Sequence, residues 1–165
     1  MSARPTLRLL LSHPAHFVSL GLGAGLAPRA PGTVGSFAAW GLYLLAEPVI
    51  AAQPAWQTGL LLVLAFLLGA ACIARTGAAL GEVDHGSIVW DEFVAVWLVL
   101  LLIPAGWPWQ LAGVLVFRVF DILKPWPIRQ ADRRFKNGLG VMFDDLLAAG
   151  YTLLLLWLVL HWLGA

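Results

Sequence analysis

The chain contains few charged residues and almost no cysteine, and both shortages restrict its class. Of its 165 residues only 12% are charged, while 61% are hydrophobic; a soluble domain usually has about 25% charged residues. The single cysteine, Cys72, excludes a disulfide framework and a cysteine-based zinc site. A net charge of +1 excludes a strongly basic nucleic-acid-binding protein. The composition and length indicate one integral membrane domain, residues 1–165.

Five apolar stretches are candidates for membrane-spanning helices, which need roughly 20 mostly apolar residues. Residues 56–74 and 146–165 contain no charge, whereas the shorter stretches 36–52, 88–103 and 108–123 contain one or two acids each. We therefore expect an all-α, multi-pass membrane protein with about five helices. The apolar segment 17–27 is too short and too glycine-rich to span, so it is either a signal peptide or a short segment at the membrane surface.

The basic residues orient these helices, because lysine and arginine concentrate in cytoplasmic loops. The connections near Gln53 and Ala105 have no charge, whereas the loop between the fourth and fifth helices is strongly basic. We expect this loop and the N-terminus in the cytoplasm and the C-terminus outside. The basic residues of the loop are Lys124, Arg129, Arg133, Arg134 and Lys136.

Most acidic residues then fall at the cytoplasmic ends of the last three helices. Carboxylates inside a membrane segment usually face a polar interior that contains their partners. Several of them in one place need a hard cation, and Mg²⁺ prefers oxygen ligands while it keeps waters for a phosphate-bearing substrate. The sequence therefore predicts a Mg²⁺ site at the cytoplasmic face. Its ligands are Asp91 and Glu92 of the third helix, Asp121 of the fourth, and Asp144 and Asp145 at the start of the fifth.

Basic and hydroxyl side chains near this cluster are candidates for binding phosphate. Arg118, Lys124 and Arg129 suit phosphate oxygens because their N–H groups are charged donors. Thr33 and Ser36 lie in a Pro-Gly turn at the start of the first helix, where backbone N–H groups bind anions.

Each of these residues also has a structural interpretation. Pro-Gly forms a turn, and Ser36 caps the helix after it. Asp144 and Asp145 are suited to the N-terminal turn of a helix, where the dipole favours acids. A further alternative is an ion pair between Arg118 and an acid of the third helix, and Lys124 also fits the role of a cytoplasmic anchor.

Several motifs follow one another in an order that is typical of a known family. In this combination the chain resembles the phosphatidylglycerophosphatase A family of bacterial membrane lipid phosphatases. One departure is Ala95, where the family often has glycine, and the glycine-rich first motif argues against a cleaved signal peptide. The motifs are residues 21–28 (GLGAGLAP), 30–36 (APGTVGS), 84–93 (DHGSIVWDEF), 117–128 (FRVFDILKPWPI) and 138–145 (GLGVMFDD).

The resemblance implies Mg²⁺-dependent hydrolysis of phosphatidylglycerophosphate to phosphatidylglycerol and phosphate, on the cytoplasmic face of the bacterial inner membrane. The expected partner is the phospholipid substrate, and neither nucleic acid nor a protein partner is inferred. Attack by water is favoured, and a phospho-aspartyl intermediate stays open. We assign catalysis to Asp91, Glu92, Asp121, Lys124 and Asp145. We assign phosphate binding to Thr33, Ser36, Arg118, Lys124 and Arg129, and metal binding to Asp91, Glu92, Asp121, Asp144 and Asp145.

Two other functions compete with this one. A small multi-pass transporter would use intramembrane acids as an ion path, but Glu47 is the one acid expected on the far side. A CDP-alcohol phosphotransferase also uses acids and Mg²⁺, but its Asp-Gly-x-x-Ala-Arg signature is absent from the sequence.

Overall fold

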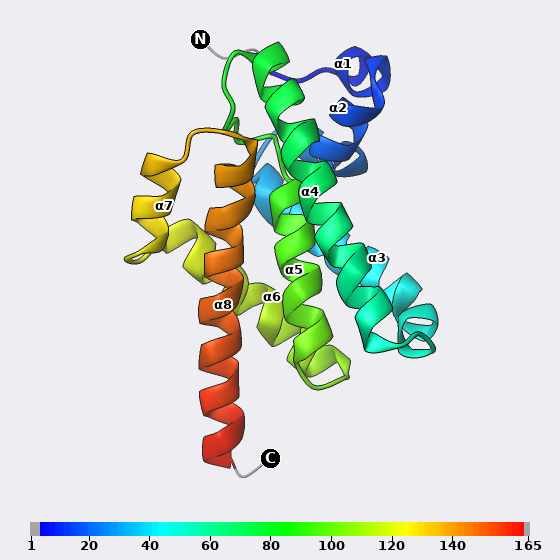
Figure 1. The fold of residues 1–165 in the computed structure, drawn as a ribbon, viewed down its shortest axis with the longest axis vertical. Coiled ribbons are helices and arrows are strands. Elements are labelled where there is room, and N and C mark those ends of the chain that lie inside the picture. The colour runs from blue at the N-terminus through cyan, green and yellow to red at the C-terminus, as the bar shows by residue number, and fades with distance from the viewer. Residues whose placement is uncertain (1–3, 164–165) are drawn as a thin grey trace.

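The computed structural model describes residues 4–163, which fold into helices with no strand among them (Figure 1). The expected all-α class is confirmed for this part of the chain. Residues 1–3, Gly164 and Ala165 belong to the predicted domain, and the last two to its final apolar stretch, but they lie outside the described residues. In chain order the elements are α1 (Leu7–Ser12), α2 (Pro14–Ser19), the 3₁₀-helix η1 (Gly21–Leu26), α3 (Pro31–Ala51), α4 (Ala55–Leu80), α5 (Trp90–Leu102), α6 (Trp107–Leu123), α7 (Ile128–Arg134) and α8 (Gly138–Leu163).

The number of helices differs from the prediction of about five, because the described residues form nine helical elements. The five apolar stretches correspond to α3, α4, α5, α6 and α8. The additional elements α1, α2, η1 and α7 have only six or seven residues each. Helices this short are stabilised by tertiary packing rather than by their own sequence, so a search for long apolar runs does not find them.

Three of the helices are long and apolar enough to cross a membrane: α3, α4 and α8, with 21, 26 and 26 residues. By contrast, α5 has 13 residues and α6 has 17, which extend ~20 Å and ~26 Å at 1.5 Å per residue. Both are shorter than the ~30 Å hydrocarbon core. Proline ends both helices at their C-termini, because Pro104 and Pro125 disfavour helical backbone in the residue before them.

The short helix α5 lies in the interior of the bundle and packs against α3, α4, α6 and α8. Nine of its 13 residues are buried, as expected for a helix that is apolar on all sides. Ala95, where the resembling family often has glycine, is 1% exposed within this packing. Because α5 also begins with Asp91 and Glu92, its burial takes two carboxylates into the protein.

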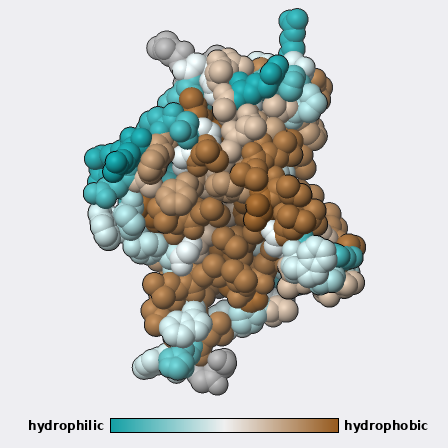
Figure 2. Space-filling model, in the orientation of Figure 1, coloured by the Kyte–Doolittle hydropathy of each residue, from teal (hydrophilic) through white to brown (hydrophobic). Residues whose placement is uncertain are grey.

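The surface of the bundle is strongly apolar over much of the face that Figure 2 shows. Figure 2 shows hydrophobic residues over the middle of the molecule and hydrophilic ones gathered beside α7 and at the end near α1. Large exposed apolar side chains follow α4, including Leu61, Leu64 and Leu68, and continue on α8 with Leu154 and Trp157. Soluble monomers rarely expose contiguous apolar areas of this kind, so this belt supports the expectation of a membrane protein.

The helix ends that contain the predicted site residues lie in the same part of the bundle. In Figure 1 the start of α5, the start of α8 and α7 lie in the upper half, while α8 ends at the bottom. Close backbone contacts hold the first glycine-rich motif against the loop before α5. The Val89 N–H donates to the Ser19 carbonyl over 3.0 Å, and a Cβ added at Gly25 would lie 2.0 Å from the Ser87 carbonyl oxygen. Only glycine allows this approach.

Candidate active site

Three buried carboxylates meet between α5 and α8, and we call them the carboxylate triad: Asp91, Glu92 and Asp145. One oxygen from each lies within 4.8 Å of the other two, and the three residues are 9%, 8% and 3% exposed. Within the part of the chain that the structure describes, Asp91 Oδ1, Glu92 Oε2 and Asp145 Oδ2 have no hydrogen-bond partner. Buried like charges at this separation are unfavourable unless protons or a cation neutralise them.

The position of Asp145 corrects one prediction from the sequence. The two acids do not begin the last helix, because α8 already starts at Gly138 and has no acid in its first turn. Asn137 precedes the helix, and its Oδ1 accepts the Gly140 N–H over 2.8 Å, as an N-cap residue does. The interpretation of Asp144 and Asp145 as first-turn acids is therefore wrong, and both project from the second turn into the bundle.

Arg118 and Asp121 of α6 border the carboxylate triad. Arg118 Nη1 donates to Glu92 Oε1 over 3.4 Å and also to Asp121 Oδ2, one turn further along α6. The ion pair between Arg118 and an acid of the third predicted helix, left open by the sequence, is thus present and involves Glu92. Arg118 Nε has no hydrogen-bond partner among the described residues.

The start of α3 closes the same site from another side. A Cβ added at Gly32 would lie 2.3 Å from Glu92 Oε1 and 3.0 Å from Arg118 Nη2. A side chain at this position would collide with the charged groups, so the backbone of the Pro-Gly motif lies directly against them. Four helices, α3, α5, α6 and α8, therefore surround one polar interior.

Lys124 joins this site to α7 through two ion pairs. Its Nζ lies 2.5 Å from Asp144 Oδ2 and 2.9 Å from Asp132 Oδ1. Burial alone would lower the pKa of Lys124, but the hydrogen bonds to Asp144 and Asp132 outweigh it and raise this pKa above its ordinary value. Burial would likewise raise the pKa of Asp132, but Lys124 outweighs it and the pKa is lowered. Both groups are therefore charged at neutral pH.

Asp132 is the residue of this site that the sequence did not indicate. It lies in the basic loop, eight positions after Lys124, with Arg133 and Arg134 beside it. The sequence alone therefore favours a solvent-exposed surface charge at this position. The folding of this loop into α7 turns Asp132 toward Lys124. A second lysine, Lys136, lies 3.7 Å from Asp132 and 3.4 Å from Asp84, which extends the ion pairs to the loop before α5.

Comparison with known proteins identifies the family. A family model described as phosphatidylglycerophosphatase A matches residues 17–160. This chain belongs to the phosphatidylglycerophosphatase A family. The membership confirms the resemblance drawn from the motifs, and because the family is one of phosphatases it also confirms the prediction of an enzyme.

Two relatives cover nearly the whole chain. A phosphatidylglycerophosphatase A of Haemophilus influenzae is 42% identical over 160 residues, which is 96% of both chains. One of Escherichia coli is 39% identical over 156 residues, 93% of this chain and 88% of the relative. No solved structure matches the chain.

The remaining predicted phosphate-binding residues of this family member lie at different depths. Thr33 is partly buried in the first turn of α3, next to Gly32. Ser36 is fully buried, and its hydroxyl donates to the Gly32 carbonyl over 3.0 Å, so this proton is used inside the helix. Arg129 is exposed on α7. The structure therefore brings Arg118 and Lys124 to the acids, while Arg129 faces solvent, and the roles of all five stay predictions.

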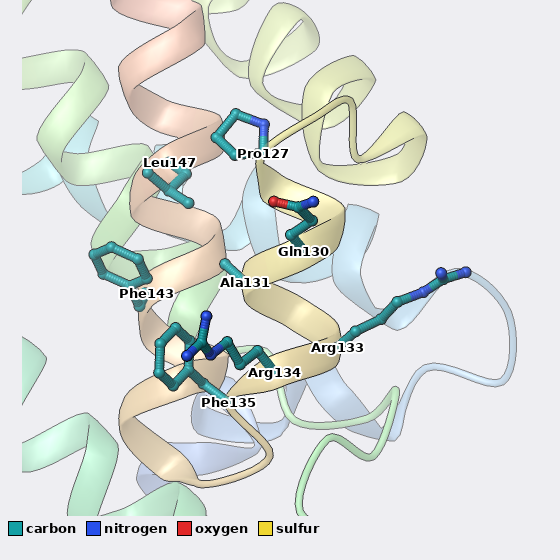
Figure 3. Close-up of a pocket in the computed structure, with 8 residues that line it drawn as sticks. All are labelled: Pro127, Gln130, Ala131, Arg133, Arg134, Phe135, Phe143 and Leu147. Atoms are coloured by element: carbon teal, nitrogen blue, oxygen red, sulfur yellow. The ribbon is translucent and has the colours of Figure 1, made fainter.

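A groove of about 720 Å³ lies between α7 and α8, outside this site (Figure 3). Phe135, Phe143 and Leu147 give it an apolar lining, and in Figure 3 Arg133 extends away from them while Arg134 points across the groove. Phe143 and Leu147 each stand two positions from Asp145 on α8, a rotation of about 200° at 3.6 residues per turn. The groove therefore faces away from the carboxylate triad.

Proposed function

We propose that this chain hydrolyses the terminal phosphate of phosphatidylglycerophosphate, with Mg²⁺, to give phosphatidylglycerol and inorganic phosphate. The observation that carries the proposal is the carboxylate triad: three buried acids from two helices with unpartnered oxygens, in a member of a phosphatase family. The reaction adds water across the bond between phosphorus and the terminal glycerol oxygen. It would form the last step of phosphatidylglycerol synthesis.

The donor set of the triad fits Mg²⁺. Its atoms are carboxylate oxygens, which hard cations prefer, and Mg²⁺ characteristically uses one or two carboxylates together with waters and substrate phosphate. Asp91, Glu92 and Asp145 would hold the metal through the oxygens that have no partner among the described residues, although Glu92 Oε1 also accepts from Arg118. Asp121 and Asp144 have Arg118 and Lys124 as partners. Mg²⁺, when bound there, supplies positive charge that polarises the phosphoryl group.

The protein's own cations supply the remaining charge. The buried Nε–H of Arg118 has no hydrogen-bond partner among the described residues, so it would donate to a phosphoryl oxygen while Nη1 stays on Asp121. Lys124 is held by two carboxylates at the end of α6, which limits the positions of its ammonium group. Phosphoryl transfer depends mainly on positioning and charge stabilisation, and both cations would contribute to these in the transition state.

The position of the site at one end of the apolar surface supports a lipid substrate. The site is formed where α3, α5 and α8 begin, at one end of an apolar belt (Figures 1 and 2). The basic residues of α7 lie near this end, and by the positive-inside rule it would face the cytoplasm of the bacterial inner membrane. A reporter fused after Gly138 should then read as cytoplasmic and one inserted at Gln53 as external. The opposite result would reverse the orientation.

The transporter alternative lacks an ion path in this arrangement. Glu47 lies near the other end of α3, where its Oε1 accepts a hydrogen bond from Gln110 Nε2 over 2.9 Å. A proton or ion pathway needs acids at successive depths, and the other membrane-embedded acids cluster at one end.

The decisive experiment is phosphate release from phosphatidylglycerophosphate by the purified protein in mixed micelles. We expect activity with Mg²⁺, its loss in EDTA and its return when Mg²⁺ is added in excess. A variant with Asp145→Asn, purified in the same way, is the control for a contaminating phosphatase. Activity that persists in EDTA would reject the metal, and the absence of release under all conditions would reject the function.

A further inference from the structure

A polar pocket formed by segments that continue into the active site is not used by the proposed hydrolysis. It has a volume of about 470 Å³ and lies between the N-terminal segment, the end of η1 with the residues that follow it, and the loop before α5. Arg4, His85 and Ser87 line it together with Gly25, Pro28 and Pro31. Two of the motifs that gave the resemblance to the family, residues 21–28 and 84–93, therefore supply most of the lining of this pocket, and no acid lines it.

The pocket adjoins the acids through two short stretches of chain. Pro31 lines the pocket, and the next residue, Gly32, lies against Glu92 and Arg118. Ser87 lines it too, and four residues later the chain reaches Asp91 of the triad. Two of the segments that line the pocket therefore lead directly to residues of the active site.

The polar groups of the pocket are suited to an anion. The Ser87 N–H donates to His85 Nδ1 over 3.1 Å, so Nδ1 is an acceptor and the ring proton resides on Nε2. That leaves Nε2–H as a donor that the loop does not use in this bond. Arg4 adds a guanidinium group, which binds phosphate oxygens through two parallel N–H bonds.

The two motifs, residues 21–28 and 84–93, pack closely against each other and form a wall of the pocket. The 2.0 Å separation between a Cβ built at Gly25 and the Ser87 carbonyl oxygen means that no side chain fits between them. The Ile88 N–H donates to the His85 carbonyl over 2.7 Å, which closes the turn containing His85. The His85 donor thus belongs to a folded loop that is packed on the helix bundle, whereas Arg4 comes from the N-terminal segment.

We propose that this pocket binds the internal phosphodiester of the lipid headgroup, and that it selects substrates having both a phosphodiester and a terminal phosphate. This inference rests on the proposed function, because the substrate of that reaction contains the two phosphates. The monoester reacts at the triad, and the diester, which carries one negative charge and does not react, is held by Arg4 and His85. Lipids with a monoester alone lack this second contact.

The test measures inhibition by phosphatidylglycerol, which has the diester and lacks the terminal phosphate. Phosphate release from phosphatidylglycerophosphate is followed in neutral mixed micelles with added phosphatidylglycerol in one series and inorganic phosphate in another. The variants are Arg4→Ala and His85→Asn. Asparagine still offers an oxygen to the Ser87 N–H but has no counterpart of Nε2–H. Arg8→Ala is the matched control, since Arg8 is an exposed arginine of α1 that does not line the pocket.

We expect Arg4→Ala and His85→Asn each to weaken inhibition by phosphatidylglycerol and to raise the KM about 10-fold, as for a lost hydrogen bond to a charged group. The kcat and the inhibition by inorganic phosphate should stay within about twofold of the wild type. Arg8→Ala should leave all four quantities unchanged.

Three results would overturn the inference alone while hydrolysis itself is intact. In the first, phosphatidylglycerol does not inhibit the wild-type enzyme. In the second, the pocket variants weaken inhibition by phosphatidylglycerol and by inorganic phosphate equally. In the third, Arg8→Ala has the same effect as Arg4→Ala. A wild-type enzyme that releases no phosphate would instead reject the proposed function, and this inference with it.

Discussion

Two polar networks lie at opposite ends of α3, and they differ in how their acids are neutralised. Near the end of the helix, Glu47 accepts from Gln110 Nε2, and Gln110 Oε1 accepts from Trp40 Nε1 over 3.0 Å. At its start, ~22 Å away at 1.5 Å per residue, Gly32 lies against the carboxylate triad. There each of the three acids has an oxygen without a hydrogen-bond partner among the described residues. Of the two nearest cations, Arg118 divides its Nη1 between Glu92 and Asp121, and Lys124 binds Asp144.

The difference indicates which acids need a ligand. Gln110 is 2% exposed and uses both ends of its amide, so the Glu47 network is complete and joins α3 to α6 as a structural contact. Buried polar groups are nearly always hydrogen-bonded in native proteins. The carboxylate triad departs from this rule at three neighbouring acids, and this arrangement is expected where a cation completes the site.

The largest effect should follow from neutralising the carboxylate triad. We expect Asp91→Asn, Glu92→Gln and Asp145→Asn each to lower phosphate release roughly 1,000-fold or more, since metal charge stabilisation contributes several kcal/mol. Without Mg²⁺ the same variants should have a Tm at or above that of the wild type, because repulsion among the acids is reduced. Mg²⁺ should raise the Tm of the wild type only. Near-normal turnover in all three would show that the triad is structural.

Lys124→Ala should have the next largest effect, a loss of roughly 100-fold in kcat, as for removal of a group that meets transition-state charge. Rates must be normalised to folded protein, because Asp144 loses its buried partner. The control is the double change Arg133→Ala with Arg134→Ala on α7, which should stay within about threefold of the wild type because exposed charges contribute little. A fully active Lys124→Ala beside an inactive double variant would move the phosphate site to α7.

Asp132→Asn should lower kcat about 10-fold, because Asp132 holds Lys124 and outer partners of a site typically contribute 10- to 100-fold. The matched variant is Asp132→Glu, which keeps the charge and should recover part of the rate. An unchanged rate in Asp132→Asn, with Lys124→Ala inactive, would mean that Asp144 alone positions the lysine. The readout is the initial rate at saturating substrate and Mg²⁺.

Glu47→Gln should have the smallest effect, within about twofold in kcat and KM. Glutamine can still accept the Gln110 N–H, so the loss in stability should be ~1 kcal/mol or less. Denaturation in detergent and the micelle assay measure the two quantities. A loss of activity comparable to that of Asp145→Asn would contradict the division into a structural and a catalytic end, and would favour a path across the membrane.

The sequence by itself determined the class of the protein and the region of its site. Long apolar runs and a scarcity of charge are properties of the chain alone, so the all-α membrane character followed from them, and the ordered motifs identified the family. The position of the acids beside helix ends also predicted their common location. The short helices and the start of α8 at Gly138 did not follow, because tertiary contacts and a local cap decide them.

Only the tertiary structure decided which acids have partners. The sequence makes five acids equivalent candidates: Asp91, Glu92, Asp121, Asp144 and Asp145. The neighbours Asp144 and Asp145 nevertheless differ in the structure. Asp144 binds Lys124, whereas Asp145 has an oxygen without a partner among the described residues. Adjacent helical residues point about 100° apart, so the rotation of α8 determines which one meets the lysine. The same holds for Asp132, whose partner depends on the folding of α7. Ion pairing depends on separations of a few ångströms, which packing sets and residue order does not.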